Sequence, residues 1–157
     1  MAFQNRDDDG GNETPPTGLT TDTLGKSLGY ALRRAQLRTF DDFVRTLEPV
    51  NLRPAYYSLL AVIEENPGLN QSEASATLGI QRTNLVAMVD YLEGRGLIER
   101  RSAESDRRSY ALHLTDSGKA VVGRARELHG AHEARLAQKL GPQGREQLLR
   151  LLQKLMD

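Results

Sequence analysis

The sequence predicts a mainly α-helical protein that carries one small β-hairpin, an α+β fold. Three observations support this prediction. Apolar residues recur at three- to four-residue intervals along most of the chain, which is the spacing of amphipathic helices. Two short runs, residues 97–102 and 109–114, are instead typical of strands. Gly and Pro stand between many of these runs, where one element stops and the next begins.

Composition excludes several classes of protein. The chain has 157 residues and no Cys, which fits one compact domain without disulfides, thiolate nucleophiles or cysteine metal sites. No apolar run approaches the roughly 18 residues that a membrane span needs. The first residues, MAFQNRDDDGG, lack the basic and apolar regions of a secretory signal. We therefore expect a cytoplasmic protein with no membrane partner.

The net charge is zero, but the charges are unevenly distributed. Residues 1–25 hold five acids and one base, so the rest of the chain carries a surplus of +4. This surplus is only a mild indication of nucleic-acid binding. Residues 7–18, DDDGGNETPPTG, contain no apolar side chain that burial could use to offset the entropy of ordering. We expect residues 1–19 to be a disordered acidic tail and residues 20–157 to be a single domain.

Two amphipathic helices are predicted at the start of this domain. The first ends at Pro49, and its apolar positions are Leu24, Leu28, Leu32, Ala35, Phe40, Phe43, Val44 and Leu47. The second begins at Pro54, because a proline is well tolerated in the first turn of a helix. The sequence Asn66-Pro67-Gly68 ends the second helix.

Two shorter helices are predicted next. Asn70 can cap the third helix, with Glu73 completing a capping box, and Gly79 ends it. The fourth runs from about Gln81 to Glu93. Small or apolar residues recur at Ala74, Ser75, Leu78, Ile80, Leu85 and Met88. This pattern fits a helix-turn-helix, although any helical hairpin with a glycine turn looks similar.

The hairpin that follows could form a wing beside this unit. On its second strand, Tyr110, Leu112 and Leu114 share one face, which is expected to pack on the helices. Asp106, Arg107 and Arg108 are expected at the tip. Arginine suits a narrow, electronegative minor groove, and a nearby aspartate can orient a guanidinium. Taken alone, this tip is more simply a solvated loop; behind a helix-turn-helix, DNA binding becomes the favoured interpretation.

Two helices are predicted to complete the chain. Thr115 caps a long helix that reaches about Leu140, and Gly141-Pro142 breaks it. The last helix has many apolar positions for a chain end: Leu148, Leu149, Leu151, Leu152 and Leu155. Together with the leucines of the first helix, they predict an obligate dimer, because a partner must cover them.

Residues 92–118, LEGRGLIERRSAESDRRSYALHLTDSG, resemble the wing region of MarR-type transcription factors, with an Asp-x-Arg tip followed by Leu-Thr-x-x-Gly. The stretch NQSEASATLGIQRTNLVAMVDYL resembles their helix-turn-helix. The resemblance implies a homodimeric winged helix-turn-helix protein, in which residues 54–115 form the DNA-binding lobe. Residues 20–48 and 116–157 would form the dimerisation helices, and the fourth helix would enter the major groove of a double-stranded, pseudo-palindromic operator.

The sequence departs from the family pattern at Val86 and Ala87, where members often carry polar or basic residues. Base readout would then rely on the start of the helix: Gln81, Arg82, Thr83 and Asn84. Ala87 could contact a thymine methyl group. Val86 could do the same or pack partly against the wing, and the sequence favours neither.

A second group of residues could bind a regulatory ligand. Arginine and aromatic residues cluster in the first two helices at Tyr30, Arg33, Arg34, Arg38, Arg53, Tyr56 and Tyr57. Such a set suits a small anionic aromatic effector, a phenolic acid or its acyl-CoA thioester. The sequence is also similar to regulators of aromatic-acid and hydroxycinnamate catabolism. The simpler interpretation is that the tyrosines are core residues and the arginines lie on a dimer surface.

No catalytic or cofactor site is predicted. His129 and His132 are three apart, but no third ligand accompanies them, so we expect no metal. No phosphate loop or nucleophile elbow occurs, so an enzyme is not expected. The sequence therefore favours a homodimeric, ligand-released repressor. The alternatives are a ligand-independent DNA-binding protein and a helical dimer that mediates protein contacts.

Overall fold

The computed structural model describes residues 22–103 and 106–156, with only the backbone of residues 22, 23, 103 and 106–109. The expected tail, residues 1–19, lies outside the described residues. The chain divides into two compact units, residues 1–37 and residues 38–157, and each is described by itself. None of the described helices is both long enough and apolar enough to cross a membrane.

The first predicted helix is interrupted. The structure has a short helix α1 (Asp22–Gly25) and a longer helix α2 (Leu28–Leu47) in its place. Ser27 N–H donates to the Leu24 carbonyl at 2.9 Å, and the Ser27 carbonyl accepts from Ala31 N–H at 3.0 Å. Ser27 therefore closes one turn and starts the next helix, a boundary role that serine favours over a helix interior. The prediction of one continuous helix was wrong at this point.

The segment after α2 reverses the chain in two tight steps. A 3₁₀ turn, η1 (Glu48–Val50), contains Pro49, and Asn51 follows in the left-handed conformation with φ 49° and ψ 49°. Helix α3 (Pro54–Glu65) then begins with Pro54 in its first turn, as predicted. This reversal places the end of α2 next to the start of α3.

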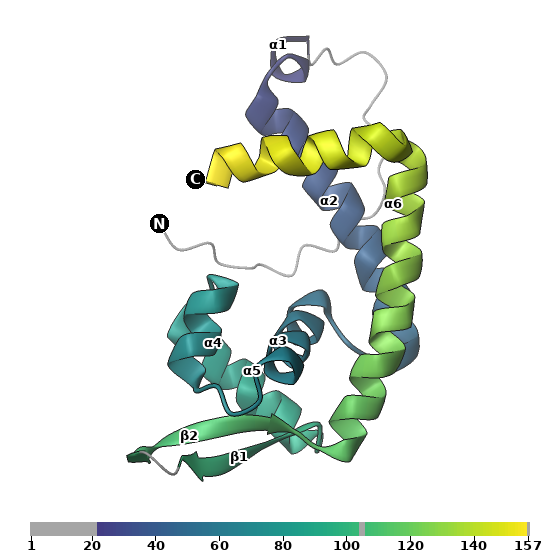
Figure 1. The fold of residues 1–157 in the computed structure, drawn as a ribbon. Coiled ribbons are helices and arrows are strands. Elements are labelled where there is room, and N and C mark those ends of the chain that lie inside the picture. Colours follow the sequence, from purple (N-terminus) through teal and green to yellow (C-terminus); the bar gives the residue numbers. More distant parts are fainter. Residues whose placement is uncertain (1–21, 104–105, 157) are drawn as a thin grey trace. The chain divides into compact units, whose positions relative to one another are not determined.

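Two helices and a hairpin pack around α3 to form a lobe (Figure 1). They are α4 (Gln71–Leu78), α5 (Arg82–Gly94), β1 (Ile98–Ala103) and β2 (Asp106–Leu114). The core of the lobe consists of side chains that are almost fully buried: Leu59, Leu60, Ile63, Leu85, Val89, Leu92, Ile98 and Leu112. The 3–4 spacing of the helical members explains why one face of α3 and one face of α5 turn inward.

The hairpin is longer than predicted. β1 and β2 pair antiparallel, with Arg100 opposite Leu112 and Ser102 opposite Tyr110, and the register shifts between Ser102 and Ala103. Because β2 begins at Asp106, the stretch 106–108 is strand backbone and not part of the connecting loop, which corrects the prediction. The predicted inward face is right for Leu112 and Leu114 but not for Tyr110, which is 54% exposed. The hairpin continues past the packed helices (Figure 1), so the same face has no core to contact there.

A short segment before α4 pairs with the edge of β2 that faces away from β1. Gly68 N–H donates to the Leu112 carbonyl at 3.0 Å, and Leu112 N–H donates to the Leu69 carbonyl at 2.9 Å. Asn70 forms a bridge with Ala111. These bonds tie the start of the helix-turn-helix to the hairpin.

Helix α6 (Asp116–Met156) begins beside the base of the hairpin. Thr115 caps it, since Gly118 N–H donates to Thr115 Oγ1 at 3.0 Å and the Thr115 hydroxyl donates to the Gly96 carbonyl at 2.6 Å. The helix changes direction at Gly141, whose φ of 73° and ψ of 164° are not helical (Figure 1). The predicted break at Gly141-Pro142 is therefore present, as a bend between two helical segments.

Candidate nucleic-acid interface and the adjoining cavity

Helices α4 and α5 form a helix-turn-helix whose ends are fixed by local hydrogen bonds. Asn70 Oδ1 accepts from Ser72 N–H and Glu73 N–H at 2.9 and 3.0 Å, and Glu73 Oε2 accepts from Asn70 N–H at 2.8 Å. This is the predicted capping box. The turn itself uses Gly79, with φ 63°, and the Ser75 hydroxyl donates to the Ile80 carbonyl at 2.5 Å. The small side chain of Ser75 thus holds the two helices at a fixed angle.

Helix α5 separates its apolar residues from the residues predicted to contact DNA. Leu85, Val89 and Leu92 are buried in the lobe. The exposed side carries Gln81, Arg82, Thr83, Asn84, Val86 and Ala87. Val86 is 37% exposed, so it belongs to this open side. The arrangement presents guanidinium, amide and hydroxyl groups next to small apolar ones, which suits the mixed chemistry of base edges in a major groove.

The hairpin is braced to α5 by an arginine that sequence reasoning missed. The Arg100 guanidinium forms ion pairs with Asp90 and with Glu93. The Arg100 backbone N–H also approaches Glu93 Oε1, at 3.3 Å. Asp90 and Glu93 are three residues apart and lie on one side of the helix, so a single guanidinium can reach both. The sequence feature that could have predicted this contact is the pair of acidic residues three positions apart on the helix, followed by a strand that carries an arginine.

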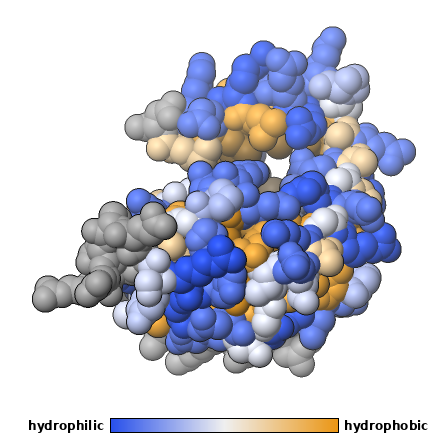
Figure 2. All heavy atoms as spheres, turned by 60° about the horizontal axis from the view of Figure 1, so that its bottom comes forward, coloured by the Kyte–Doolittle hydropathy of each residue, from blue (hydrophilic) through white to orange (hydrophobic). Residues whose placement is uncertain are grey.

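The predicted bracing by Asp106 concerns side chains outside the described residues. The backbones of Asp106, Arg107 and Arg108 belong to β2. Their proposed contacts with DNA and with each other stay predictions. The observed brace is at the other end of the hairpin, close to α5. Hydrophilic residues cover much of the face that carries the hairpin in Figure 2.

A cavity of about 480 Å³ lies beside α5, between the end of α2 and the start of α3. Its lining residues are Val44, Glu48, Asn51, Leu52, Arg53, Tyr56 and Tyr91. The rings of Tyr56 and Tyr91 are stacked, with centroids 4.6 Å apart and planes inclined by 22°. Two of the predicted ligand-binding residues, Arg53 and Tyr56, therefore line a cavity, together with Tyr91, which was not predicted.

Within the unit 38–157, the two remaining predicted ligand-binding residues, Arg38 and Tyr57, do not line this cavity. Tyr57 is buried and contacts Phe43, with ring centroids 5.9 Å apart, so the simpler core interpretation is right for this tyrosine. Arg38 is exposed on α2. Tyr30, Arg33 and Arg34 belong to the unit 1–37, in which the Arg34 guanidinium lies 5.9 Å from the Tyr30 ring centroid.

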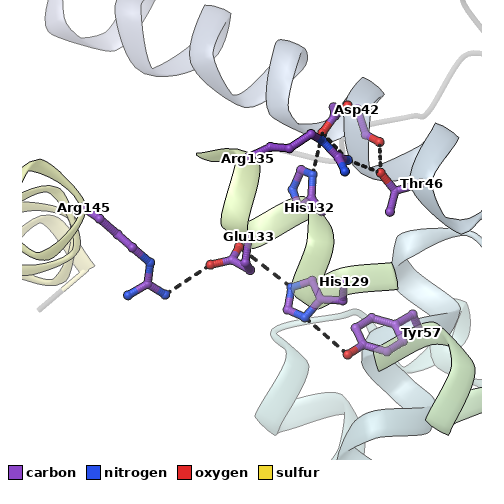
Figure 3. Close-up of polar contacts among 8 residues, drawn as sticks. All are labelled: Asp42, Thr46, Tyr57, His129, His132, Glu133, Arg135 and Arg145. Carbon is purple, nitrogen blue, oxygen red and sulfur yellow. Dashed lines mark hydrogen bonds and ion pairs between the residues drawn. The ribbon is translucent and has the colours of Figure 1, made fainter. Parts of the chain in front are cut away.

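The two histidines of α6 belong to two separate sets of polar contacts (Figure 3). His132 Nδ1 lies 2.7 Å from Asp42 Oδ2, and Arg135 Nη2 donates to the same oxygen at 2.9 Å. Hydrogen bonds from Arg135 and then from His132 lower the pKa of Asp42 below its ordinary value. His129 Nδ1 instead faces the Tyr57 hydroxyl at 3.4 Å, and burial raises the pKa of Tyr57.

The histidines thus have different partners. Their rings are 6.4 Å apart, and no group of three potential metal ligands occurs within residues 22–103 and 106–156.

Comparison with known proteins places the chain among transcriptional regulators. A model of the MarR family matches residues 50–109. The chain is 33% identical over 138 residues to a putative transcriptional regulatory protein for the hcr operon of Thauera aromatica, covering 87% of this chain and 83% of that protein. It is also similar to a solved structure of the transcriptional repressor CouR bound to a 23-mer DNA duplex, with 49% identity, a TM-score of 0.85 and coverage of 88% and 99%. CouR bound to p-coumaroyl-CoA gives 46% identity, a TM-score of 0.82 and coverage of 88% and 97%.

Proposed function

The chain belongs to the MarR family of transcriptional regulators, and from this premise we propose that it is a homodimeric repressor released from its operator by an aromatic acyl-CoA thioester. The observation that carries the DNA-binding part is the exposed side of α5, next to a hairpin that Arg100 fixes to the same helix. The similar CouR repressor was solved with DNA, which supports operator binding by this chain.

In this proposal, α5 enters the major groove. Arg82 can bind guanine, Gln81 and Asn84 can bind adenine, and Thr83 and Ala87 contact neighbouring base edges. Arg107 and Arg108 contact the backbone and the minor groove, with Asp106 orienting one of them. A dimer presents two such surfaces, so its operator is pseudo-palindromic.

Dimerisation uses the helices at both ends of the domain, residues 20–48 and 116–157, and residues 54–115 form the DNA-binding lobe. Each unit exposes large apolar side chains on its own: Leu24 and Leu28 in the first, and Leu148, Leu149, Leu151 and Leu155 in the second. An isolated chain would leave these side chains in water, which a second copy prevents. Sedimentation of the full chain at micromolar concentration tests this, and a stable folded monomer would contradict it.

The proposed effector is a phenolic acid in its CoA thioester form. The support is the p-coumaroyl-CoA bound by the similar CouR repressor and the cavity that Tyr56, Tyr91 and Arg53 line here. The relatives in the comparison are transcriptional regulators, and we assign no catalytic role and no cofactor to this chain. As a regulator of chromosomal DNA, it acts in the cytoplasm.

The decisive experiment measures binding to the promoter region of the protein's own gene by fluorescence anisotropy, with and without p-coumaroyl-CoA. We expect tight binding that the thioester reverses. Arg82→Ala should lose specific affinity, with a cost of about 1–3 kcal/mol that is typical of a base contact.

Each alternative function predicts a different result. Binding that p-coumaroyl-CoA leaves unchanged would indicate a ligand-independent DNA-binding protein. A dimer that shows no preference for this DNA would indicate a protein-interaction module.

A further inference from the structure

The bend in α6 separates an anchored segment from one that exposes its apolar side chains. Before the bend, His129 Nδ1 faces the Tyr57 hydroxyl of α3 at 3.4 Å, and His132 Nδ1 lies 2.7 Å from Asp42 Oδ2 of α2 (Figure 3). After Gly141, the exposed large side chains include Leu148, Leu149, Leu151 and Leu155. In the proposed dimer these leucines contact the second copy, so the direction of the last segment decides how the two copies are oriented.

The backbone at the bend does not fix this direction by itself. Gly141 has a φ of 73° and a ψ of 164°, and a Cβ atom at this position would meet nothing within 4 Å. Glycine reaches neighbouring backbone conformations at little cost. Pro142 has no N–H group with which to bond back to the preceding turn. A contact between the two segments is therefore needed to select one direction.

Glu133 and Arg145 form such a contact across the bend. Arg145 Nη2 donates to Glu133 Oε2 at 3.2 Å, although the two residues are 12 positions apart (Figure 3). In a straight helix, 12 positions would separate them by about 18 Å along the axis. The ion pair therefore exists only in the bent form of α6, and it favours that form.

The same carboxylate also faces the anchored side of the helix. Glu133 Oε1 lies 3.9 Å from His129 Nε2, and the other ring nitrogen of His129 faces the Tyr57 hydroxyl. Tyr57 is buried in the core of the unit 38–157. Polar contacts thus continue from α3, inside the DNA-binding lobe, to Arg145 beyond the bend.

We propose that Glu133 and Arg145 are positioning residues that set the distance between the two α5 helices of the dimer, and with it the half-site spacing that the protein prefers. This inference rests on the proposed function. Two half-sites one helical turn apart have centres about 34–36 Å apart, and one added base pair moves a half-site by about 3.4 Å. A change in the direction of the last segment moves one lobe relative to the other and so changes which spacing both α5 helices can reach.

The strength of the ion pair suits this role. The side chains of Arg145 and Glu133 are 47% and 39% exposed. An ion pair with this exposure shifts an equilibrium by only about a few-fold. That is too little to hold the fold together, but it is enough to favour one direction of the last segment over another. Loss of the pair should therefore widen the range of orientations without unfolding the protein.

The first test measures the distance between the two lobes without DNA. The chain has no Cys, so Thr77→Cys on the exposed side of α4 carries one spin label per protomer. Double electron–electron resonance should give a narrow distance distribution for the dimer. Arg145→Gln and Glu133→Gln should each make it about twofold wider. The control is Arg150→Gln, because Arg150 pairs with Glu146 within the last segment.

Two further conditions separate a positioning role from a general loss of stability. The charge-exchanged double variant, Glu133→Arg with Arg145→Glu, should restore the narrow distribution. High salt should widen the wild-type distribution, because screening weakens an exposed ion pair. Sedimentation and melting temperature show whether each variant is a folded dimer.

The second test measures spacing preference on DNA. The probes are the promoter fragment of the protein's own gene and the same fragment with one base pair added between the half-sites. We expect the wild type and Arg150→Gln to prefer the unchanged fragment at least tenfold, and Arg145→Gln to prefer it about threefold or less.

The outcomes distinguish this inference from the function on which it rests. If Arg145→Gln keeps both the narrow distribution and the full spacing preference, or if charge exchange restores neither, the positioning role is wrong. A wild-type monomer would overturn the inference as well. A wild-type dimer with a narrow distribution and no affinity for the promoter fragment would instead overturn the proposed function.

Discussion

His132 and Asp42 are 90 positions apart in the sequence, yet His132 Nδ1 lies 2.7 Å from Asp42 Oδ2. His132 is only 4% exposed, and its ring is stacked on Phe43 with a centroid distance of 4.9 Å. Arg135 reaches both Asp42 and the Thr46 hydroxyl, the latter at 2.6 Å. One carboxylate thus satisfies a buried imidazole and a guanidinium, and it joins the second half of α2 to α6.

Replacing Asp42 by Ala should lower the free energy of unfolding by roughly 1–3 kcal/mol, because a buried polar ring loses its partner. Asp41→Ala is the matched control, since Asp41 is exposed and adjacent. Urea denaturation of both variants checks this. If Asp42→Ala and Asp41→Ala lose the same free energy of unfolding, the contacts of Asp42 do not stabilise the fold.

The same pair gives a pH dependence. Because the hydrogen bonds from Arg135 and His132 lower the pKa of Asp42 in the folded state, the ionised carboxylate stabilises the fold. This contribution is fully present above the ordinary value of 3.8 and is lost as the pH falls through the lower folded-state pKa. The stability difference between wild type and Asp42→Ala should therefore stay constant near neutral pH and shrink below 3.8. Denaturation curves over this range measure it, and a difference that grows on acidification would contradict the assignment.

Gly118→Ala should destabilise the protein. A Cβ atom at this position would lie 1.9 Å from the Leu97 carbonyl oxygen, which belongs to the backbone and cannot rotate away. Overpacking of this kind costs about 1–3 kcal/mol or more. At Gly123 of the same helix, a Cβ would meet nothing within 4 Å. Gly123→Ala should instead stabilise by about 0.5–1 kcal/mol, and opposite shifts in melting temperature are the expected result.

Arg100→Ala should weaken operator binding about tenfold, roughly 1.4 kcal/mol, because the hairpin loses its attachment to α5. Arg124→Ala is the control, as its exposed side chain pairs only with Glu127 on its own helix among the described residues. Anisotropy with the operator measures both. A fall in melting temperature without loss of operator affinity would show that Arg100 is only a stabilising residue.

Asp106→Ala should weaken DNA binding although it removes a negative charge near DNA. The reason is the proposed orienting contact with a wing arginine. Arg108→Ala should cost roughly 1–3 kcal/mol per half-site, and Arg107→Ala should weaken binding to all sequences and flatten the salt dependence. Salt-titrated affinities of the three variants test this, and tighter binding by Asp106→Ala with an unchanged fold would refute the orienting role.

The elements that the sequence predicted correctly depend on close neighbours. The Asn70–Glu73 capping box, the turn at Gly79 and the cap at Thr115 each need partners only a few residues away or a glycine that can take positive φ. The break at Ser27 was missed for the opposite reason, because Leu24 and Leu28 keep an uninterrupted i, i+4 spacing across it. The spacing of apolar residues cannot reveal a turn when that spacing continues unchanged across it.

The contacts that could not be predicted are long-range. Nothing near Tyr91 in the sequence indicates that it stacks on Tyr56, and nothing near Asp42 indicates His132. Such pairs are set by how α2, α3, α5 and α6 pack. Of the predicted ligand-binding group, Tyr56 and Tyr57 adjoin in sequence but lie on different faces of α3, one in a cavity and one in the core.

The contacts of Arg100 have a consequence for how the protein leaves DNA. Because Arg100 pairs with both Asp90 and Glu93, we expect the hairpin to move together with α5 when that helix rotates. In the proposed binding mode, the minor-groove and major-groove contacts at one half-site are then gained and lost in a single step. Half-site dissociation should be all-or-none, and single-molecule traces should show no long-lived state in which the hairpin alone stays on the duplex.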